Sequence, residues 1–508
     1  MSPLDSIAQA ERLPLLALGG LIGFAAAACV VLRVVRPLLA HKDGPPTLPY
    51  WIPWHGIWYM RNARDVVDTA YRRYGSYAPF TLMLGGQTVH VVGNPQDVKT
   101  VYRLSRALSF EPITTEIVAL FGMGKTSKRL RDMFSAEGLG VGHGGSSKAN
   151  LIQLAHPFFR DELTSRTRLQ LIGERYITEL ERVMDGINRR FRTSQGTKQG
   201  APASIEVPMW NFCREAVFTA SVNAMYGRSL IDKHKETFEV YNAFDEEFHK
   251  LVFQFPEHLT TEVRQNREHS STLEDTAAEV INKWHELMLQ KSGMTLREIV
   301  SGAFSIFWGF NTNSIKTSFW ILVFISSTPN LVDRLRAEFA AAFSTPNGMP
   351  SIDYLTKECP LLNAVFNETL RVATAPSSMR LVEEESVVGG FVLREGERVL
   401  LPSMHLHRAK HFWGEDADEF RPDRMLEMAK TTDPVAAGYL RAFGGGSSYC
   451  PGRIFSRGEI IAFVAVMLQR YDLVMLGEPP VPNTGPPTLG VLDPPMPCGL
   501  RMRLTTRL

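Results

Sequence analysis

The chain has 508 residues, of which 44% are hydrophobic and 21% are charged, a composition typical of a globular protein with a sizeable core. Its formal net charge of +2 comes from basic residues scattered among acidic ones, which argues against nucleic acid and other polyanions as partners. The five cysteines are widely spaced and include no Cys-x-x-Cys pair, which argues against a disulfide framework and a zinc site.

A hydrophobic segment lies close to the N-terminus, at residues 13–32, and contains no charged residue. As a helix rising about 1.5 Å per residue it spans about 30 Å, the thickness of a bilayer's hydrocarbon core. A cleaved signal peptide is the alternative, but the run is longer than the usual apolar core of about 7–15 residues, and Asp5 and Glu11 precede it. We therefore predict a single transmembrane anchor.

Basic residues are unequally distributed around this segment. Arg12 alone precedes it. Three basic residues follow it: Arg33, Arg36 and Lys42. Because positive charge favours the cytosolic side, we expect residues 1–43 to be the anchor and juxtamembrane segment and residues 44–508 to be one cytosolic domain. Prolines stiffen the linker at residues 44–49.

A long apolar segment at residues 296–324 has helical character, and Lys316 is its only charge after Glu298. A second transmembrane span is the alternative interpretation. The centre of the segment is polar, however, with Asn311, Thr312, Asn313 and Ser314 in succession. Polar groups are least tolerated at the middle of a bilayer, so we predict a buried helix that crosses a polar active site.

An acidic and a basic residue, Glu368 and Arg371, lie three positions apart in the apolar helical stretch 361–372, where they face the same side and can pair. The same spacing occurs in Glu179/Arg182 and Glu395/Arg398. An exposed ion pair is the default interpretation of each. Only the first pair is followed, in order, by a strand-like segment at 398–401, by Phe420-Arg-Pro-Asp-Arg424 and by a glycine-rich loop.

In that loop three glycines precede a cysteine, in the sequence Phe443-Gly-Gly-Gly-Ser-Ser-Tyr-Cys450-Pro-Gly-Arg453. Glycines let a backbone turn sharply and approach a flat cofactor. Apolar residues at helical spacing predict a helix at 454–468, whose N-terminus favours a thiolate and lowers the pKa of Cys450. A lone cysteine is more often a small buried hydrophobe, but the spacing of Phe443, Gly446, Cys450 and Gly452 favours a metal ligand.

This pattern resembles the haem-binding loop of the cytochrome P-450 family, whose thiolate donates electron density to iron. The helix with Glu368 and Arg371 and the segment ending at Arg424 resemble two further family motifs in the same order, and residues 44–49 resemble the hinge of microsomal members. The resemblance covers the chain from about residue 44. It implies a mainly α fold with a small β-rich lobe, preceded by a single N-terminal transmembrane helix.

The resemblance assigns roles to residues of the loop. Cys450 is implied as the axial ligand of haem b, Phe443 as packing against the loop, and Gly446 and Gly452 as permitting its path. Ser448 stands where the family commonly has Arg or His to bind a haem propionate. Propionate binding is therefore expected to depend on other residues.

Other roles come from the neighbouring motifs. Glu368, Arg371 and Arg424 are implied as a buried charge network that braces the cysteine loop. Arg380, nine residues after Arg371, matches a family position that donates to a propionate, for which its fork of donors is suited. An ordinary surface arginine is the alternative.

The helix at 296–324 resembles the family helix that crosses the haem, where an acid and an alcohol deliver protons to bound dioxygen. Here Asn313 replaces the acid, and it can hold a water but cannot supply a proton, whereas Ser314 retains a hydroxyl. Phe310 is expected on the same side as Ser314, crowding the pocket above the iron. The flanking Trp308-Gly309 and Phe319-Trp320 resemble the branch that holds cholesterol 7α-hydroxylase and prostacyclin synthase.

Two further segments are implied as lining the substrate pocket, namely residues 110–122 and a hairpin at 491–495. Plain core packing is the alternative for both. The family's Trp-x-x-x-Arg signature for a second propionate contact is not evident in this sequence.

The resemblance implies a fungal-type tailoring enzyme of secondary metabolism at the endoplasmic reticulum membrane. It would be a single-pass monooxygenase that oxidises a lipophilic terpenoid, steroid or polyketide-like molecule with O2 and electrons from NADPH–cytochrome P-450 reductase. Haem carries the chemistry, and the protein supplies the thiolate, proton delivery and orientation. Two alternatives stay open: a redox-neutral isomerase or dehydratase acting on a peroxide, and a non-enzymatic haem sensor or carrier.

Overall fold

The computed structural model describes residues 42–49, 55–123, 163–195, 204–252, 296–346 and 348–507, and single residues among 20–31. The predicted anchor at 13–32 lies almost wholly outside this part of the chain. Within the described residues, no helix combines the length and the apolar character needed to cross a bilayer. These residues pack as two compact units.

The first unit comprises Met1–Ser109, Ser378–Pro402 and Thr484–Pro487 and is built on a five-stranded sheet in the order β1-β2-β8-β5-β3. The strands are β1 (Phe80–Leu84), β2 (Gln87–Val91), β3 (Leu108–Ser109), β5 (Ser377–Val382) and β8 (Arg398–Pro402). β2 pairs with β1 antiparallel and with β8 parallel. The strand expected at 398–401 is therefore β8, inside the sheet.

Helices α3 (Gly56–Arg61), α4 (Ala63–Tyr74) and α5 (Pro95–Arg103) belong to this unit, as does the hairpin of β6 (Ser386–Val388) and β7 (Phe391–Leu393). Asparagine side chains begin two of the helices: Asn62 caps α4 by accepting from the amide of Asp65, and Asn94 caps α5. Apolar residues of α4 pack with Phe80 and other sheet residues in a separate small core.

The second unit, Phe110–Ser377, Ser403–Asn483 and Thr488–Leu508, is mainly helical. Its helices before the cysteine loop are α6 (Glu111–Val118), η2 (Ala119–Met123), α9 (Arg166–Gln195), α10 (Met209–Tyr226), α11 (Ser229–Lys233), α12 (Thr237–Val252), α15 (Leu296–Ser327), α16 (Leu331–Phe339), η4 (Ala340–Phe343), α17 (Ile352–Lys357), α18 (Pro360–Ala373), α19 (Ser403–His407), α20 (Lys410–Trp413), α21 (Asp423–Met428) and α22 (Pro434–Ala437). The loop holds η5 (Gly446–Ser448), and α23 (Arg453–Arg470) follows it. A three-stranded sheet joins β4 (Ser204–Pro208), β10 (Arg501–Thr506) and β9 (Tyr471–Leu476).

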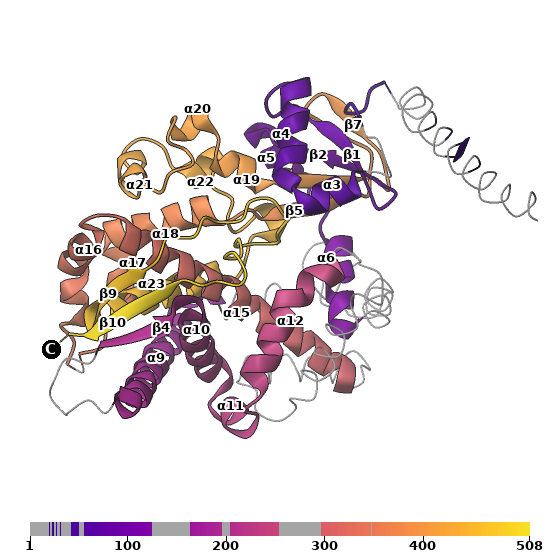
Figure 1. The fold of residues 1–508 in the computed structure, drawn as a ribbon. Coiled ribbons are helices and arrows are strands. Elements are labelled where there is room, and N and C mark those ends of the chain that lie inside the picture. Colours follow the sequence, from indigo (N-terminus) through magenta and orange to yellow (C-terminus); the bar gives the residue numbers. More distant parts are fainter. Residues whose placement is uncertain are drawn as a thin grey trace, which may run out of the picture. The chain divides into compact units, whose positions relative to one another are not determined.

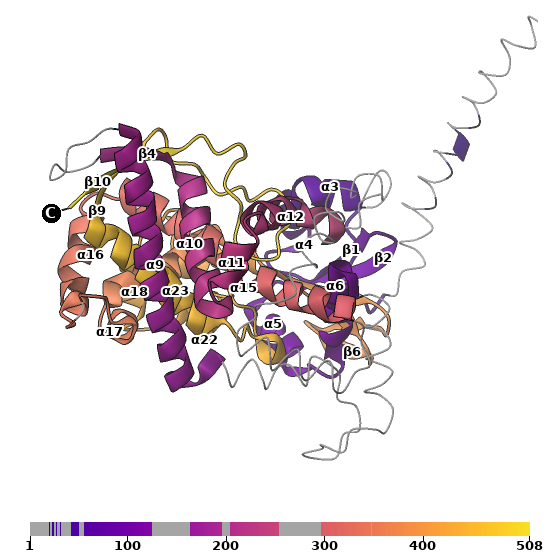
Figure 2. The same ribbon diagram turned by 90° about the horizontal axis from the view of Figure 1, so that it is seen from below.

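Four helices, α9, α10, α15 and α23, contact one another and form the centre of this unit, as the ribbon views show (Figures 1 and 2). The helices predicted at 296–324 and 454–468 are α15 and α23. Both helices bury apolar residues along their length, and α15 also buries Asn311, Thr312 and Ser314 near its centre. Each is surrounded by other helices and has little exposed face. The alternative of a second transmembrane span at 296–324 is therefore wrong.

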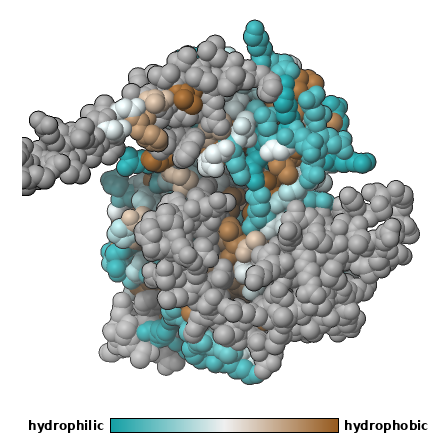
Figure 3. Space-filling view, turned by 90° about the vertical axis from the view of Figure 1, so that its right-hand side faces the viewer, coloured by the Kyte–Doolittle hydropathy of each residue, from teal (hydrophilic) through white to brown (hydrophobic). Residues whose placement is uncertain are grey.

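Exposed apolar side chains are scattered over the described surface. On the face shown in Figure 3 the described residues are mainly hydrophilic, with hydrophobic residues in small separate areas. Single exposed apolar residues of this kind, such as Ile57 and Val481, are normal on a protein surface. Most of the residues expected to carry chemistry lie in the second unit.

Candidate active site

Cys450 lies three residues before α23, at the end of the glycine-rich loop. Its amide donates to the carbonyl of Phe443 at 3.1 Å, which closes the loop. Gly444 and Gly446 have φ of 75° and 60°, backbone conformations that residues with a Cβ rarely adopt. Glycine at these two positions therefore shapes the path of the chain into the cysteine.

Gly452 differs from these two glycines because its φ is −79°, which any residue adopts. A Cβ at this position would lie 3.9 Å from the Cys450 sulfur and 4.0 Å from the Phe310 ring. Backbone conformation therefore does not require glycine here, and its expected part in cofactor binding depends on space alone. The same distances show that Phe310, on α15, borders the space next to the sulfur.

The environment of Cys450 acts on its pKa in two directions. Burial raises the pKa of the thiol, whereas the amides of Gly452 and Arg453 and the Arg453 charge lower it. Burial prevails and the pKa of the thiol is raised overall, although the amides at the start of α23 lower it as expected. A cation bound to the sulfur favours the thiolate. A partly buried sulfur with two amides directed at it fits a thiolate-bound metal in a planar cofactor.

Phe310 and Ser314 lie one turn apart on α15 and both face α23. The Phe310 ring meets that of Phe455 edge-on, with centroids 6.0 Å apart. Ser314 donates its hydroxyl to Glu459, one turn beyond Phe455 on α23. A flat cofactor beside Cys450 would have to fit against the Phe310 ring, which agrees with the expectation that this side chain crowds the pocket.

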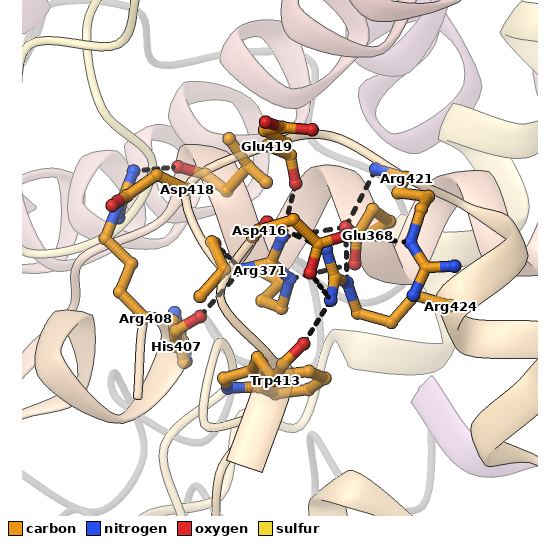
Figure 4. A network of polar contacts seen from close by, with 12 residues as sticks. Glu368, Arg371, His407, Arg408, Trp413, Asp416, Asp418, Glu419, Arg421 and Arg424 are labelled. Atoms are coloured by element: carbon orange, nitrogen blue, oxygen red, sulfur yellow. Dashed lines mark hydrogen bonds and ion pairs between the residues drawn. The ribbon is translucent and has the colours of Figure 1, made fainter. Parts of the chain in front are cut away.

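The carboxylate of Glu368 lies between two guanidinium groups (Figure 4). Arg371 donates to both of its oxygens, at 2.8 and 2.7 Å, and Arg424 Nε lies 3.4 Å from one of them. Glu368 and Arg371 are 0% exposed and Arg424 is 2% exposed. In contrast, Glu179 pairs chiefly with Arg228, at 2.5 Å.

The two arginines also bind backbone carbonyls of the segment between α19 and α21. Arg371 donates to the carbonyls of His407 (2.9 Å), Glu419 (2.7 Å) and Ala417. Arg424 donates to the side chain and carbonyl of Asp416, at 2.8 and 2.9 Å, and to the carbonyl of Trp413. The buried charges therefore fix a long irregular stretch of chain, as Figure 4 shows.

His407, which sequence reasoning missed, connects this stretch of chain to the cysteine loop. Its Nε2 accepts from the amide of Arg441 at 2.9 Å, two residues before Phe443. Its Nδ1 lies 3.2 Å from the carbonyl of Thr374 and therefore carries the proton. Burial lowers the pKa of His407 to about 3, and the charges of neighbouring arginines lower it further. The imidazole is thus a neutral link.

Arg380 lies on β5 in the first unit and is 1% exposed. It donates to the Ser378 hydroxyl and the Met379 carbonyl, both at 2.8 Å, and its guanidinium lies 5.2 Å from the centre of the Tyr102 ring. Burial lowers its pKa. The alternative of a surface arginine is therefore wrong, while the role at a haem propionate stays a prediction.

Asn313 and Ser314 point to different parts of the second unit. Asn313 Oδ1 accepts from the amide of Val491 at 3.0 Å, whereas Ser314 turns towards α23. Residues 491–492 do not form the expected hairpin, because Val491 bridges to Thr374 instead. Val491 and Leu492 are buried, which favours core packing for these two residues.

Lys316 makes a second contact between α15 and the segment at residues 491–493. Sequence reasoning missed this contact. Its ammonium lies 2.8 Å from Asp493 and 3.6 Å from Asp245 of α12, and these two charges raise its pKa although burial opposes them. Asp245 also accepts from Thr312 at 2.6 Å and from Trp308 at 2.7 Å. The signal in the sequence was one lysine in an apolar helix.

Comparisons with known proteins show which family has a sequence similar to this chain. Residues 240–502, just over half of the chain, match the model of the cytochrome P-450 family. A cytochrome P-450 monooxygenase of Gibberella zeae is 30% identical over 199 residues, which are 36% of this chain and 38% of that protein. The 7-alpha-hydroxycholest-4-en-3-one 12-alpha-hydroxylase of Homo sapiens is 24% identical over 91% of this chain and 93% of its own length.

Cytochrome P-450 7A1 of Oryctolagus cuniculus is 22% identical over 93% of this chain and 96% of its own length. These relatives confirm the family and the expected likeness to steroid hydroxylases and fungal enzymes. Family members bind haem b through an axial cysteine thiolate. The chain is therefore an oxidoreductase of the cytochrome P-450 family.

Proposed function

We propose that this protein is a haem-thiolate monooxygenase that hydroxylates or otherwise oxidises a lipophilic small molecule, with O2 and electrons from an NADPH-dependent reductase. The observation that carries the proposal is Cys450, held by the Phe443 carbonyl in a loop that leads directly into α23. Relatives named as monooxygenases and as a steroid 12-alpha-hydroxylase support it. A steroid, terpenoid or polyketide-like substrate fits these relatives.

Cys450 would hold haem b, which when bound supplies the redox chemistry. Phe443 and Gly446 shape the loop next to it, Gly452 leaves space beside the sulfur, and Arg380 would bind a propionate. The charge network of Glu368, Arg371 and Arg424 holds the stretch of chain before the loop. These residues would bind the cofactor or hold the chain around it.

The helix α15 serves proton delivery and substrate positioning with different residues. Ser314 carries a hydroxyl that can receive and release a proton. Asn313 uses its carbonyl oxygen to hold the Val491 amide at 3.0 Å, so its amide nitrogen is the part that can bind water. Phe310 narrows the space beside Cys450 and thereby restricts the shape of a substrate.

Residues 13–32 would anchor the protein in the endoplasmic reticulum membrane, with the catalytic domain in the cytosol. Their lack of charge and the basic residues that follow them support this proposal. Attachment to the bilayer would keep the protein beside lipophilic substrates and a membrane-bound reductase.

A redox-neutral isomerase or dehydratase is the second candidate, because an amide stands at the position where the family commonly has an acid. The two candidates differ in their need for electrons. In membranes that contain the protein and a cytochrome P-450 reductase, a panel of steroids and terpenoids should yield oxidised products only with NADPH. Rearrangement of an organic peroxide into an isomer, without NADPH or reductase and without oxidation of a second molecule, would contradict monooxygenation and favour the isomerase.

A further inference from the structure

The part of α15 that carries Phe310 and Ser314 is attached to α12 through one carboxylate, Asp245. This carboxylate binds three donors that follow one another at intervals of four residues along α15. They are the indole N–H of Trp308 at 2.7 Å, the hydroxyl of Thr312 at 2.6 Å and the ammonium of Lys316 at 3.6 Å. Residues four apart lie on the same face of a helix, so this face of α15 is the one that holds α12.

A second set of contacts attaches α15 to the segment 490–493. Asn313 accepts from the amide of Val491 at 3.0 Å, Lys316 lies 2.8 Å from Asp493, and Trp320 donates to the carbonyl of Leu492 at 2.7 Å. The fit is close, because a Cβ at Gly490 would overlap the carboxamide of Asn313. On its other side the segment pairs with residues 373–375 at the end of α18.

Lys316 belongs to both sets of contacts. Its side chain and that of Asp245 are each 12% exposed, whereas that of Asp493 is 60% exposed. Burial opposes the charge, but the two carboxylates raise the pKa of Lys316, so the ammonium persists at neutral pH. A buried charge that loses a partner is strongly destabilising. A single cation therefore restrains two elements that meet α15 from different directions.

We infer that Lys316 is a positioning residue that ties α12 to the segment 490–493 across α15 and thereby determines which ligands fit beside Cys450. Phe310 borders the space next to the Cys450 sulfur, and it lies on the part of α15 that these contacts hold. Release of the tie would let α15 shift and widen that space. Lys316 acts through α15 and its two neighbours, and its role in substrate selection rests on the proposed monooxygenase function.

Hydrogen exchange of the haem-loaded protein tests the tie without turnover. Lys316→Met removes the charge and keeps an unbranched side chain of similar length. Amides of α12 and of the segment 490–493 should both exchange faster, because local opening of each becomes easier. Gly490→Ala displaces the Asn313 carboxamide and leaves the contacts of Asp245 intact, so it should speed exchange in the segment alone.

Ligand binding at the iron, followed by the shift of the Soret band, tests the effect on selection. Coupling between two sites commonly changes affinity by about 5–150-fold, so in Lys316→Met we expect a triaryl imidazole to bind about 10-fold more tightly relative to imidazole. Lys316→Arg keeps the charge and should keep the selectivity of the unaltered protein. Lys410→Met is the matched control, because Lys410 pairs with Glu415 at 3.0 Å on the surface, and it should change neither measurement.

If Lys316→Met does not fold, the double variant Asp245→Asn/Lys316→Met takes its place, because it leaves no unpaired charge on α12 at this position. The same faster exchange and the same change in selectivity are expected. Faster exchange in only one of the two elements overturns the tie, as does equal loosening in Lys316→Arg. An unchanged ratio of the two affinities overturns the role in ligand selection.

These results leave the proposed function standing, since none of them measures turnover. Absence of NADPH-dependent oxidation by the unaltered protein would instead overturn monooxygenation. The exchange of α12 and of the segment 490–493 would still decide whether Lys316 ties them.

Discussion

Glu368 and Glu459 are both buried carboxyl groups on helices of the second unit, but they have opposite partners. Glu368 lies between two guanidinium groups, whereas Glu459 meets only hydroxyls from its two hydrogen-bonding neighbours. A carboxylate flanked by cations is held as an anion and makes a rigid structural joint. One that lacks a cation has its pKa raised towards neutrality and can exchange a proton. The partner, and not the residue type, decides the role.

The largest loss of stability is expected when Glu368, the carboxylate paired with arginines, is removed. In Glu368→Ala, the buried Arg371 loses its carboxylate partner, whereas Arg424 keeps Asp416. The unpaired charge of Arg371 should lower the free energy of unfolding by about 3–5 kcal/mol. The protein should incorporate little haem, as measured by absorbance per mole of protein. Arg182→Ala is the matched control, because Arg182 is half-exposed and 3.6 Å from Glu179, and surface ion pairs contribute only about 0–1 kcal/mol. Equal stability of the two variants would contradict the account of the network.

The stability of the protein should depend on pH through Glu459. Its folded-state pKa is raised to about 7 from 4.5, so the folded protein binds more protons than the unfolded chain between these values. Stability from this group is present below pH 4.5 and is lost as pH rises through 7. The full loss is about 3 kcal/mol. Glu459→Gln should therefore gain stability relative to the unaltered protein between pH 5 and 8 in urea titrations, and a constant difference would contradict the uncompensated burial.

His407 sharpens the comparison because it is buried among cations and must stay neutral. Its folded-state pKa is lowered to about 3 from 6.5, so the unfolded chain binds the extra proton between these values. This contribution to stability is present above pH 6.5 and lost as pH falls. His407→Phe should cost about 1–3 kcal/mol at pH 7, since it leaves the Arg441 amide unpaired. It should also unfold with a shallower acid dependence.

The control for His407 is His411→Ala, because His411 lies at the exposed surface. It should keep the acid dependence of the unaltered protein. If His407→Phe and His411→Ala lost stability in parallel with falling pH, the neutral link between Thr374 and Arg441 would not be the acid-sensitive element.

Substitution of Phe310 should have the smallest effect, which is limited to the size of the ligands that the iron can bind. Its ring borders the space beside Cys450, so Phe310→Ala should admit bulkier ligands of the iron. Removal of apolar crowding of this kind is worth about 1–2 kcal/mol, or about 5–30-fold in affinity for a triaryl imidazole. Imidazole itself serves as the internal control and should bind equally to both proteins. Equal affinity for the bulky ligand would place Phe310 outside the pocket.

Local patterns in the sequence predicted the local structure. Apolar stretches located α15 and α18, and helical spacing located α23. The spacing of Glu368 and Arg371 predicted a pair that the structure brings together. Contacts between distant segments were not predictable, because they depend on how the helices pack. Ser314 and Glu459 are 145 positions apart, and His407 binds a loop that no motif connects with it. The signal for Glu459 was a single carboxylate in an otherwise apolar stretch of helix.

The central claim is that Cys450 is the axial ligand of a haem-thiolate enzyme. The carbon monoxide complex of the reduced, haem-loaded protein tests it most directly, because a thiolate ligand shifts the Soret band to longer wavelength. We predict the shifted band in the unaltered protein and in Cys498→Ala, and its loss in Cys450→Ala. A shifted band that survives in Cys450→Ala would contradict the account.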